Sequence, residues 1–129
     1  MKLFFPIQQA TILIPTNNNE DKHLFVLLTN PSGPEQKILL VGISSARAGC
    51  DPSCFLFPGD HPFIRHKSFA YYARARITPQ EKIISGVDQG LFKPKEIMPA
   101  GSMARIVNGL FESPYSTPAC KDFYTAASS

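Results

Sequence analysis

Apolar residues in the first half of the chain form short runs of strand length, and each run is followed by residues that favour turns. The run TILI at 11–14 stops at Pro15, and HLFVLLT at 23–29 follows a polar loop. KILLVGISS at 37–45 comes after the turn-rich segment NPSGPEQ at 30–36. Continuous apolar runs of this length are typical of strands buried on both faces. The pattern therefore predicts short strands, of which the second and third pair antiparallel.

Two further strands are predicted before residue 78. CFLFP at 54–58 is a short apolar run that ends at a proline, and SFAYYARARI at 68–77 is rich in aromatic residues. Side chains alternate between the two faces of a strand. Tyr71 and Tyr72 are therefore expected to point to opposite faces, so that only one of them can face a site.

The hydrophobic period changes after residue 77. Thr78-Pro79-Gln80-Glu81 has the form of a capping box with proline at the first helical position, which predicts a helix over 79–89. Gly90 provides the C-terminal stop. A second helix is predicted over 99–112, because apolar residues recur there at helical spacing. These residues are Met103, Ile106, Val107, Leu110 and Phe111.

Strands that precede helices indicate an α+β domain, mainly β, built as a small bent antiparallel sheet or barrel with helices at one side or end. The 12 prolines that bound the short strands favour this compact arrangement over an open parallel sheet. A chain of 129 residues forms one domain, with the core expected over about 11–112. The turn-rich segment 113–129 is interpreted as a tail that can be mobile, with Phe123 and Tyr124 able to dock.

Composition narrows the class of protein. Hydrophobic residues make up 43% and charged residues 18%, which is typical of a globular domain. The net charge of +3 permits a nucleic acid partner. No apolar run reaches the length of a membrane span, and the N-terminus lacks the form of a signal peptide, so no membrane partner is expected. Three cysteines without framework spacing favour a reducing compartment, and the cytoplasm is the expected location.

The segment GDHPFIRHKSF at 59–69 concentrates the candidate chemistry. Histidine moves protons near neutral pH, and basic side chains stabilise negative charge on a phosphate. RNA cleavage by its own 2′-hydroxyl needs only such groups. Nearby aromatic side chains could stack on the bases of a single strand. The polar residues in question are Asp60, His61, Arg65, His66, Lys67 and Ser68.

Other interpretations compete with acid–base chemistry. Metal-ligand types occur at His23, Cys50, Asp51, Cys54, Asp60, His61 and His66, but they lack the paired spacing of a zinc site, so neither a metal nor a cofactor is expected. No signature marks a nucleophilic cysteine or a phosphate-binding glycine loop. The segment 59–69 could also be only structural: Asp60 would cap the turn after Gly59, and backbone hydrogen bonds would hold His61.

A family resemblance adds to this picture. From His23 onward, HLFVLLT, ILLVGISS, the segment 51–54, GDHPFIRHKSF and the terminal IVNGLFESP resemble, in their order, a divergent branch of the PemK/MazF-like toxin superfamily. The resemblance covers about residues 11–115. It implies an SH3-like β-barrel with appended helices, a homodimer, metal-independent endoribonuclease activity on RNA and neutralisation by a cognate antitoxin.

At the residue level the resemblance is partial. ISS at 43–45 resembles the strand end where members carry a hydroxyl pair that contacts RNA phosphate, which makes Ser44 and Ser45 candidates. Ser68 resembles the start of the later strand that presents an arginine and an aspartate, but AYYARAR contains no aspartate. The usual acid–base pair is thus unmatched at the positions where members carry it.

The leading hypothesis moves the acid–base work to the 59–69 segment. His61 or His66 exchanges protons, and Asp60 orients a histidine or acts as the base. Phosphate binding falls to Arg65, Lys67, Ser44, Ser45 and Ser68, with His23 as a further candidate. The rival hypothesis is a non-catalytic SH3-like module that binds protein or nucleic acid through the same surface.

Overall fold

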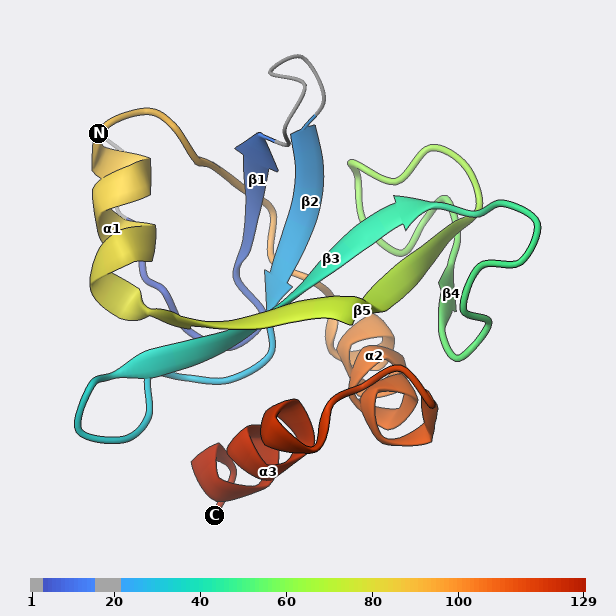
Figure 1. Ribbon diagram of the computed structural model, residues 1–129. Helices are drawn as coiled ribbons and strands as arrows, with labels where there is room; N and C mark the ends of the chain where they lie inside the picture. The colour runs from blue at the N-terminus through green and yellow to red at the C-terminus, as the bar shows by residue number, and fades with distance from the viewer. Residues whose placement is uncertain (1–3, 16–21) are drawn as a thin grey trace.

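The computed structural model describes residues 4–15 and 22–129 (Figure 1). Along these residues the elements are β1 (Thr11–Pro15), β2 (Lys22–Leu27), β3 (Lys37–Ser45), β4 (Phe55–Leu56), β5 (Ser68–Pro79), α1 (Gln80–Asp88), β6 (Lys93–Lys95), α2 (Ala100–Glu112) and α3 (Pro118–Ala127).

The strands form one antiparallel sheet in the order β4-β5-β3-β2-β1-β6. Strand β5 pairs with β3 from Ser45↔Ser68 to Lys37↔Pro79, and the register shifts between Leu40 and Gly42. Such a bulge bends a strand and increases its twist. The sheet is strongly curved in Figure 1, and within the described part of the chain no helix precedes residue 80. The predicted α+β class with a bent antiparallel sheet is confirmed.

Both faces of the sheet are covered by apolar packing. Leu24 and Val26 of β2 belong to the buried cluster that includes α2, whereas Phe25 and Leu27 belong to a second cluster with Ile83 of α1. Figure 1 shows α1 on one side of the sheet and α2 and α3 on the other, so the expectation that the helices lie at one side or end is wrong. The alternation follows from the two-residue period of a strand. The prediction that the continuous apolar runs form strands buried on both faces is confirmed.

The helix predictions are confirmed in position and corrected in detail. Helix α1 starts one residue later than the capping box implied, with Pro79 at the N-cap and no side-chain cap hydrogen bond. Thr78 cannot cap the helix because it still lies in β5, where it pairs with Ile38. Gly90 follows α1 with φ +76°, as its role at the C-terminus requires. Among the described residues, no helix has both the length and the apolar character that a membrane span requires.

The segment 113–129 is more ordered than its turn-rich sequence suggested. It contains α3, whose Thr117 cap accepts a hydrogen bond from the backbone N–H of Cys120. Cys120 is buried in the α2 cluster, and Phe123 and Tyr124 pack against it. The core therefore extends beyond residue 112, and the docking of both aromatic residues is confirmed.

Helix α2 packs tightly against the sheet at Gly109. The Tyr72 hydroxyl is buried there and donates a hydrogen bond of 2.6 Å to the Ile106 carbonyl. A Cβ at position 109 would overlap the Tyr72 hydroxyl and would lie 2.9 Å from Cys54 Cβ. Only glycine fits between helix and strand at this point.

Gly109→Ala is therefore expected to lower the free energy of unfolding by about 1–3 kcal/mol, because overpacking forces buried groups to shift. Gly101→Ala is the matched control: position 101 is on the same helix, and a Cβ there meets open space. That control is expected to raise the free energy of unfolding by about 0.5–1 kcal/mol. Urea denaturation measures both, and equal stability of the two variants would contradict this packing.

Candidate functional site

Most of the polar residues singled out from the sequence gather at one hollow of about 380 Å³ at the end of β3. Strand β2 starts there, and the segment that leads into β5 closes the opposite side. Six of the nine sequence-predicted site residues line this hollow: His23, Ser44, Ser45, Arg65, His66 and Ser68. We call it the strand-end hollow. It brings together groups from three separate parts of the chain.

Two serine–histidine pairs form the polar part of the strand-end hollow. Ser45 Oγ and His66 Nε2 share a hydrogen bond of 2.6 Å, and Ser44 Oγ and His23 Nδ1 lie 3.3 Å apart. Adjacent residues of a strand point to opposite faces. Ser44 thus faces the α1 side and Ser45 the α2 side, and both pairs reach the hollow because β3 ends at Ser45.

The other basic and hydroxyl candidates differ in their surroundings. The exposed Arg65 lines the hollow, and Lys22, which the sequence analysis did not single out, lines it too. Ser68 is buried and donates a hydrogen bond of 3.0 Å to the His66 carbonyl, so it positions the segment that carries His66. Lys67 does not line the hollow, since its ammonium group lies 4.1 Å from the centre of the Phe55 ring.

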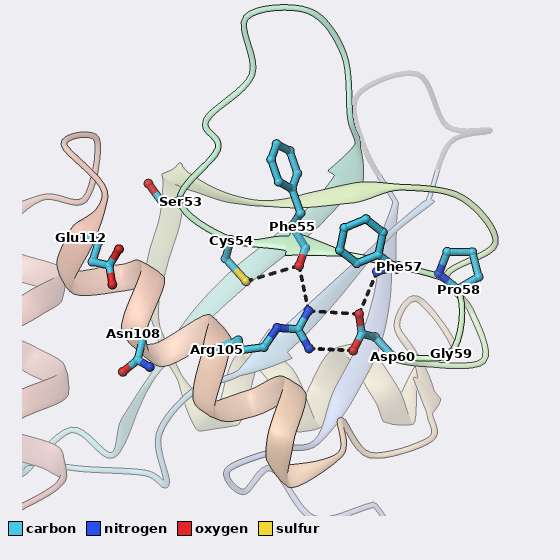
Figure 2. A pocket seen from close by; sticks show the side chains of 10 residues that line it. All are labelled: Ser53, Cys54, Phe55, Phe57, Pro58, Gly59, Asp60, Arg105, Asn108 and Glu112. Carbon is cyan, nitrogen blue, oxygen red and sulfur yellow. Dashed lines mark hydrogen bonds and ion pairs between the residues drawn. The ribbon is translucent and has the colours of Figure 1, made fainter.

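Asp60 lies outside this hollow, in a network that joins its loop to α2. Its carboxylate accepts hydrogen bonds from both terminal nitrogens of Arg105 (2.8 and 3.1 Å), from Ser102 Oγ (2.7 Å) and from the Phe57 N–H (2.7 Å). Figure 2 shows these contacts with Arg105. The hydrogen bonds from Arg105 hold the pKa of Asp60 well below its usual range. A carboxylate held so firmly in its charged form is a poor general base near neutral pH.

His61 is likewise engaged inside the protein. Its side chain is 1% exposed, and its Nε2 donates a hydrogen bond of 2.5 Å to the Glu96 carbonyl. Its Nδ1 accepts a hydrogen bond of 3.0 Å from the Phe63 N–H. Thr11 Oγ1 donates to the same Glu96 carbonyl at 2.7 Å. His61 therefore fastens its loop to β1 and to the segment before α2, and its proposed proton transfer remains a prediction that this geometry does not favour.

The cysteines show no arrangement for catalysis. Cys54 and Cys120 are buried, Cys50 is partly exposed, and all three are free. Burial raises the pKa of the Cys54 thiol, and a buried neutral thiol is usually inert. Over residues 4–15 and 22–129, no three His, Cys, Asp or Glu side chains come together as metal ligands would.

A second hollow of about 640 Å³ lies between the 53–60 segment and α2 (Figure 2). Arg105 lines this hollow and also donates a hydrogen bond of 2.8 Å to the Phe55 carbonyl. The guanidinium group is thus held between Asp60 and the backbone of β4. This arrangement joins α2 to the sheet and leaves the strand-end hollow as the better candidate for chemistry.

Comparison with protein-family models and with curated proteins finds no match to this chain. The resemblance to the PemK/MazF-like superfamily therefore rests on the order of the sequence segments described above. A curled antiparallel sheet agrees with the fold that the resemblance implies, but this architecture hosts many functions. The function has to be argued from the strand-end hollow itself.

Proposed function

We propose that this protein is a toxin-like endoribonuclease that cleaves single-stranded RNA at the strand-end hollow without a metal ion. The observation that carries the proposal is the convergence of His23, His66, Ser44, Ser45 and Arg65 at the end of β3. Two imidazoles can give and take protons near neutral pH. The guanidinium group and the hydroxyl groups can bind a phosphate.

The proposed reaction is an internal transesterification of RNA. One imidazole, of His66 or His23, takes the proton of a ribose 2′-hydroxyl, whose oxygen forms a bond to the adjacent phosphorus. The bond from phosphorus to the 5′-oxygen of the next nucleotide breaks, and the other imidazole donates a proton to that oxygen. The products are a 2′,3′-cyclic phosphate and a 5′-hydroxyl, and the reaction consumes no water in this step.

The remaining groups of the hollow bind and position the substrate. Arg65 and Lys22 neutralise the phosphate, and the Ser44 and Ser45 hydroxyls hydrogen-bond to its oxygens or hold their partner imidazoles. Asp60 and His61 act at a distance from the reaction: both fix the start of the loop from which Arg65 and His66 extend. In this scheme they are positioning residues.

The proposal includes the cytoplasmic location and the partners that the resemblance implies, namely a second copy of the chain and an antitoxin encoded alongside. Support for a protein partner comes from an apolar groove of about 670 Å³ beside β6 and α1. Phe5, Ile7 and Ile97 line it and are 52–66% exposed. Large exposed apolar side chains gathered in one place are typical of protein interfaces.

Induced expression in a bacterial host tests the proposed function. Wild-type protein is expected to stop growth while cellular RNA is degraded, and His66→Ala is expected to accumulate to the same level with growth and RNA intact. Co-expression of an adjacent small reading frame is expected to restore growth. Intact RNA in cells that accumulate folded wild-type protein would contradict the proposal and favour the binding module.

A further inference from the structure

The sheet face opposite α2 carries a continuous row of aromatic and polar side chains beside the strand-end hollow. Phe55 of β4 pairs with Phe69 of β5, and Phe69 pairs with Ser44 of β3. Ser44 in turn contacts His23 of β2. Paired residues of neighbouring antiparallel strands lie on the same face. Figure 2 shows the Phe55 ring on the opposite side of β4 from Arg105 and α2.

Basic side chains cover the aromatic rings of this face. The Arg47 guanidinium lies 5.3 Å from the centre of the Phe69 ring and 5.6 Å from that of Tyr71. Arg74 lies 5.3 Å from the Tyr71 ring, and Arg76 lies 4.6 Å from the Phe25 ring. The ammonium group of Lys67 over Phe55 continues the series. We call this surface the basic–aromatic face, and its cations are Arg47, Lys67, Arg74 and Arg76.

The three arginines of this face are exposed. Within residues 4–15 and 22–129, none of them has a carboxylate within 4 Å or donates a side-chain hydrogen bond. A guanidinium that stacks on a ring uses its flat face and keeps its N–H groups at the edge available. Those edges match the oxygens of a phosphate in a bidentate geometry.

Helix α1 leaves this part of the sheet uncovered. The α1 cluster includes Ile38 and Leu40, near the opposite end of β3 from Ser44, and it extends as far as Phe25, whose side chain is buried. Between the two ends lies Gly42, where a Cβ would meet the Phe25 ring at 3.1 Å. The Phe25 ring can therefore lie close to the backbone of β3, and Arg76 lies over it. The result is a shallow positive surface that leads to His23 and Ser44.

We propose that the basic–aromatic face binds the phosphate backbone of single-stranded RNA and guides the strand into the strand-end hollow. Arg47, Arg74 and Arg76 each hold a phosphate, and the guanidinium planes offer stacking surfaces for unpaired bases. The row from Phe55 to His23 sets the path across β4, β5, β3 and β2. This inference rests on the proposed function, because the RNA is guided toward the strand-end hollow only if cleavage takes place there.

Single-stranded RNA fits this surface better than an acidic protein segment does. Every ring of the face pairs with a cation, and the cations are spread from the segment after β3 (Arg47) and the residue before β5 (Lys67) to β5 itself (Arg74 and Arg76). A polyphosphate chain presents charge at regular intervals along such a path. Arginine stacked on an aromatic ring also accepts a base on its other face, and a carboxylate peptide has no such group.

The test measures binding separately from cleavage. The probe is a labelled single-stranded RNA of mixed sequence with a 2′-O-methyl group on every ribose, which blocks attack by the 2′-oxygen. The test variant carries Arg47→Gln, Arg74→Gln and Arg76→Gln together. The control carries Lys93→Gln, Lys95→Gln and Lys121→Gln on β6 and α3, so both variants lower the net charge from +3 to 0.

The arginine variant is expected to raise the Kd on the order of tenfold. The logarithm of the association constant falls with the logarithm of the salt concentration, and this fall is expected to become less steep by about 2, because each lost phosphate contact removes about 0.7 from the slope. The lysine control is expected to keep the wild-type slope to within about 0.7. If the variant with the three Arg→Gln changes has a lower melting temperature than the wild type, a variant with Arg→Lys at the same three positions replaces it. That second variant is expected to weaken binding several-fold with an unchanged slope, since charge remains but stacking and bidentate contacts are lost.

The outcomes separate this inference from the proposed function. Arginine-dependent RNA binding by a protein that never cleaves RNA would overturn the proposed function and support the inference. If the arginine variant cleaves RNA and has the same Kd and KM as the wild type, the inference is overturned and the proposed function stands. Equal or tighter binding of polyglutamate with the same arginine dependence would also overturn it, in favour of an acidic protein partner.

Discussion

Replacing His66 by alanine is expected to lower the rate of RNA cleavage by about 10²–10⁴-fold, which is the usual loss when a positioned general acid or base is removed. The imidazole is exposed, and its Nε2 forms one hydrogen bond, with Ser45. Its removal should therefore leave the fold intact. Single-turnover rates on a labelled RNA, measured beside melting curves of both proteins, give the effect on chemistry apart from the effect on folding.

Two further variants show whether this loss is specific. His23→Ala should also lower the cleavage rate strongly, because His23 is the second imidazole of the strand-end hollow. Lys121→Ala, in α3 and outside the lining of the hollow, should keep the wild-type rate. Wild-type rates in both folded histidine variants would remove the hollow from the mechanism.

Asp60→Asn is expected to lower the free energy of unfolding by about 2–3 kcal/mol, because charge-assisted hydrogen bonds are lost and Arg105 is left without its counter-ion. The Asp60 side chain is 14% exposed, so solvent replaces little of this loss. Asp122→Asn is the matched control. Asp122 is exposed on α3, and within the described residues it forms no ion pair or side-chain hydrogen bond. The control should change stability by less than about 0.5 kcal/mol.

The Asp60 carboxylate also makes the free energy of unfolding depend on pH under acidic conditions. The pKa of Asp60 is lower in the folded protein than in the unfolded chain, where it is about 3.9. Its contribution is therefore complete above about pH 4 and is lost as the pH falls further, because the unfolded state then binds the proton first. Urea denaturation between about pH 2 and pH 7 should show this loss in wild-type protein and a smaller one in Asp60→Asn. If Asp60→Asn is as stable as the wild type but cleaves RNA more slowly, Asp60 is a catalytic residue and not a positioning residue.

The secondary structure was largely predictable because most of its signals are local. Run length indicated the strands, and the period of Met103, Ile106 and Leu110 indicated α2. Strand β6, with sequence KPK, has no apolar pattern, and only its pairing with β1 makes it a strand. Helix α3 did carry a local signal, Thr117 followed by Pro118, that the turn-rich composition around it obscured.

The site was predictable in residue type but not in arrangement. The sequence placed Asp60, His61 and His66 in one short segment, and the structure turns them in different directions. Asp60 meets Arg105, which is 45 residues away, and His61 meets Glu96. No local pattern contains such long-range contacts. The alternation of Ser44 and Ser45 between faces was readable, whereas their separate histidine partners depend on the register of β2 and on the loop before β5.

Cleavage of a long single-stranded RNA of mixed sequence and of its DNA copy, with purified protein in excess chelator, tests the central claim most directly. Only the RNA has the 2′-hydroxyl that the proposed reaction requires. We predict that the RNA is cut to products with 2′,3′-cyclic phosphate and 5′-hydroxyl ends, that the DNA stays intact, and that added magnesium or zinc is not needed. Cleavage that requires a metal ion, or that cuts the DNA copy equally well, would contradict the account.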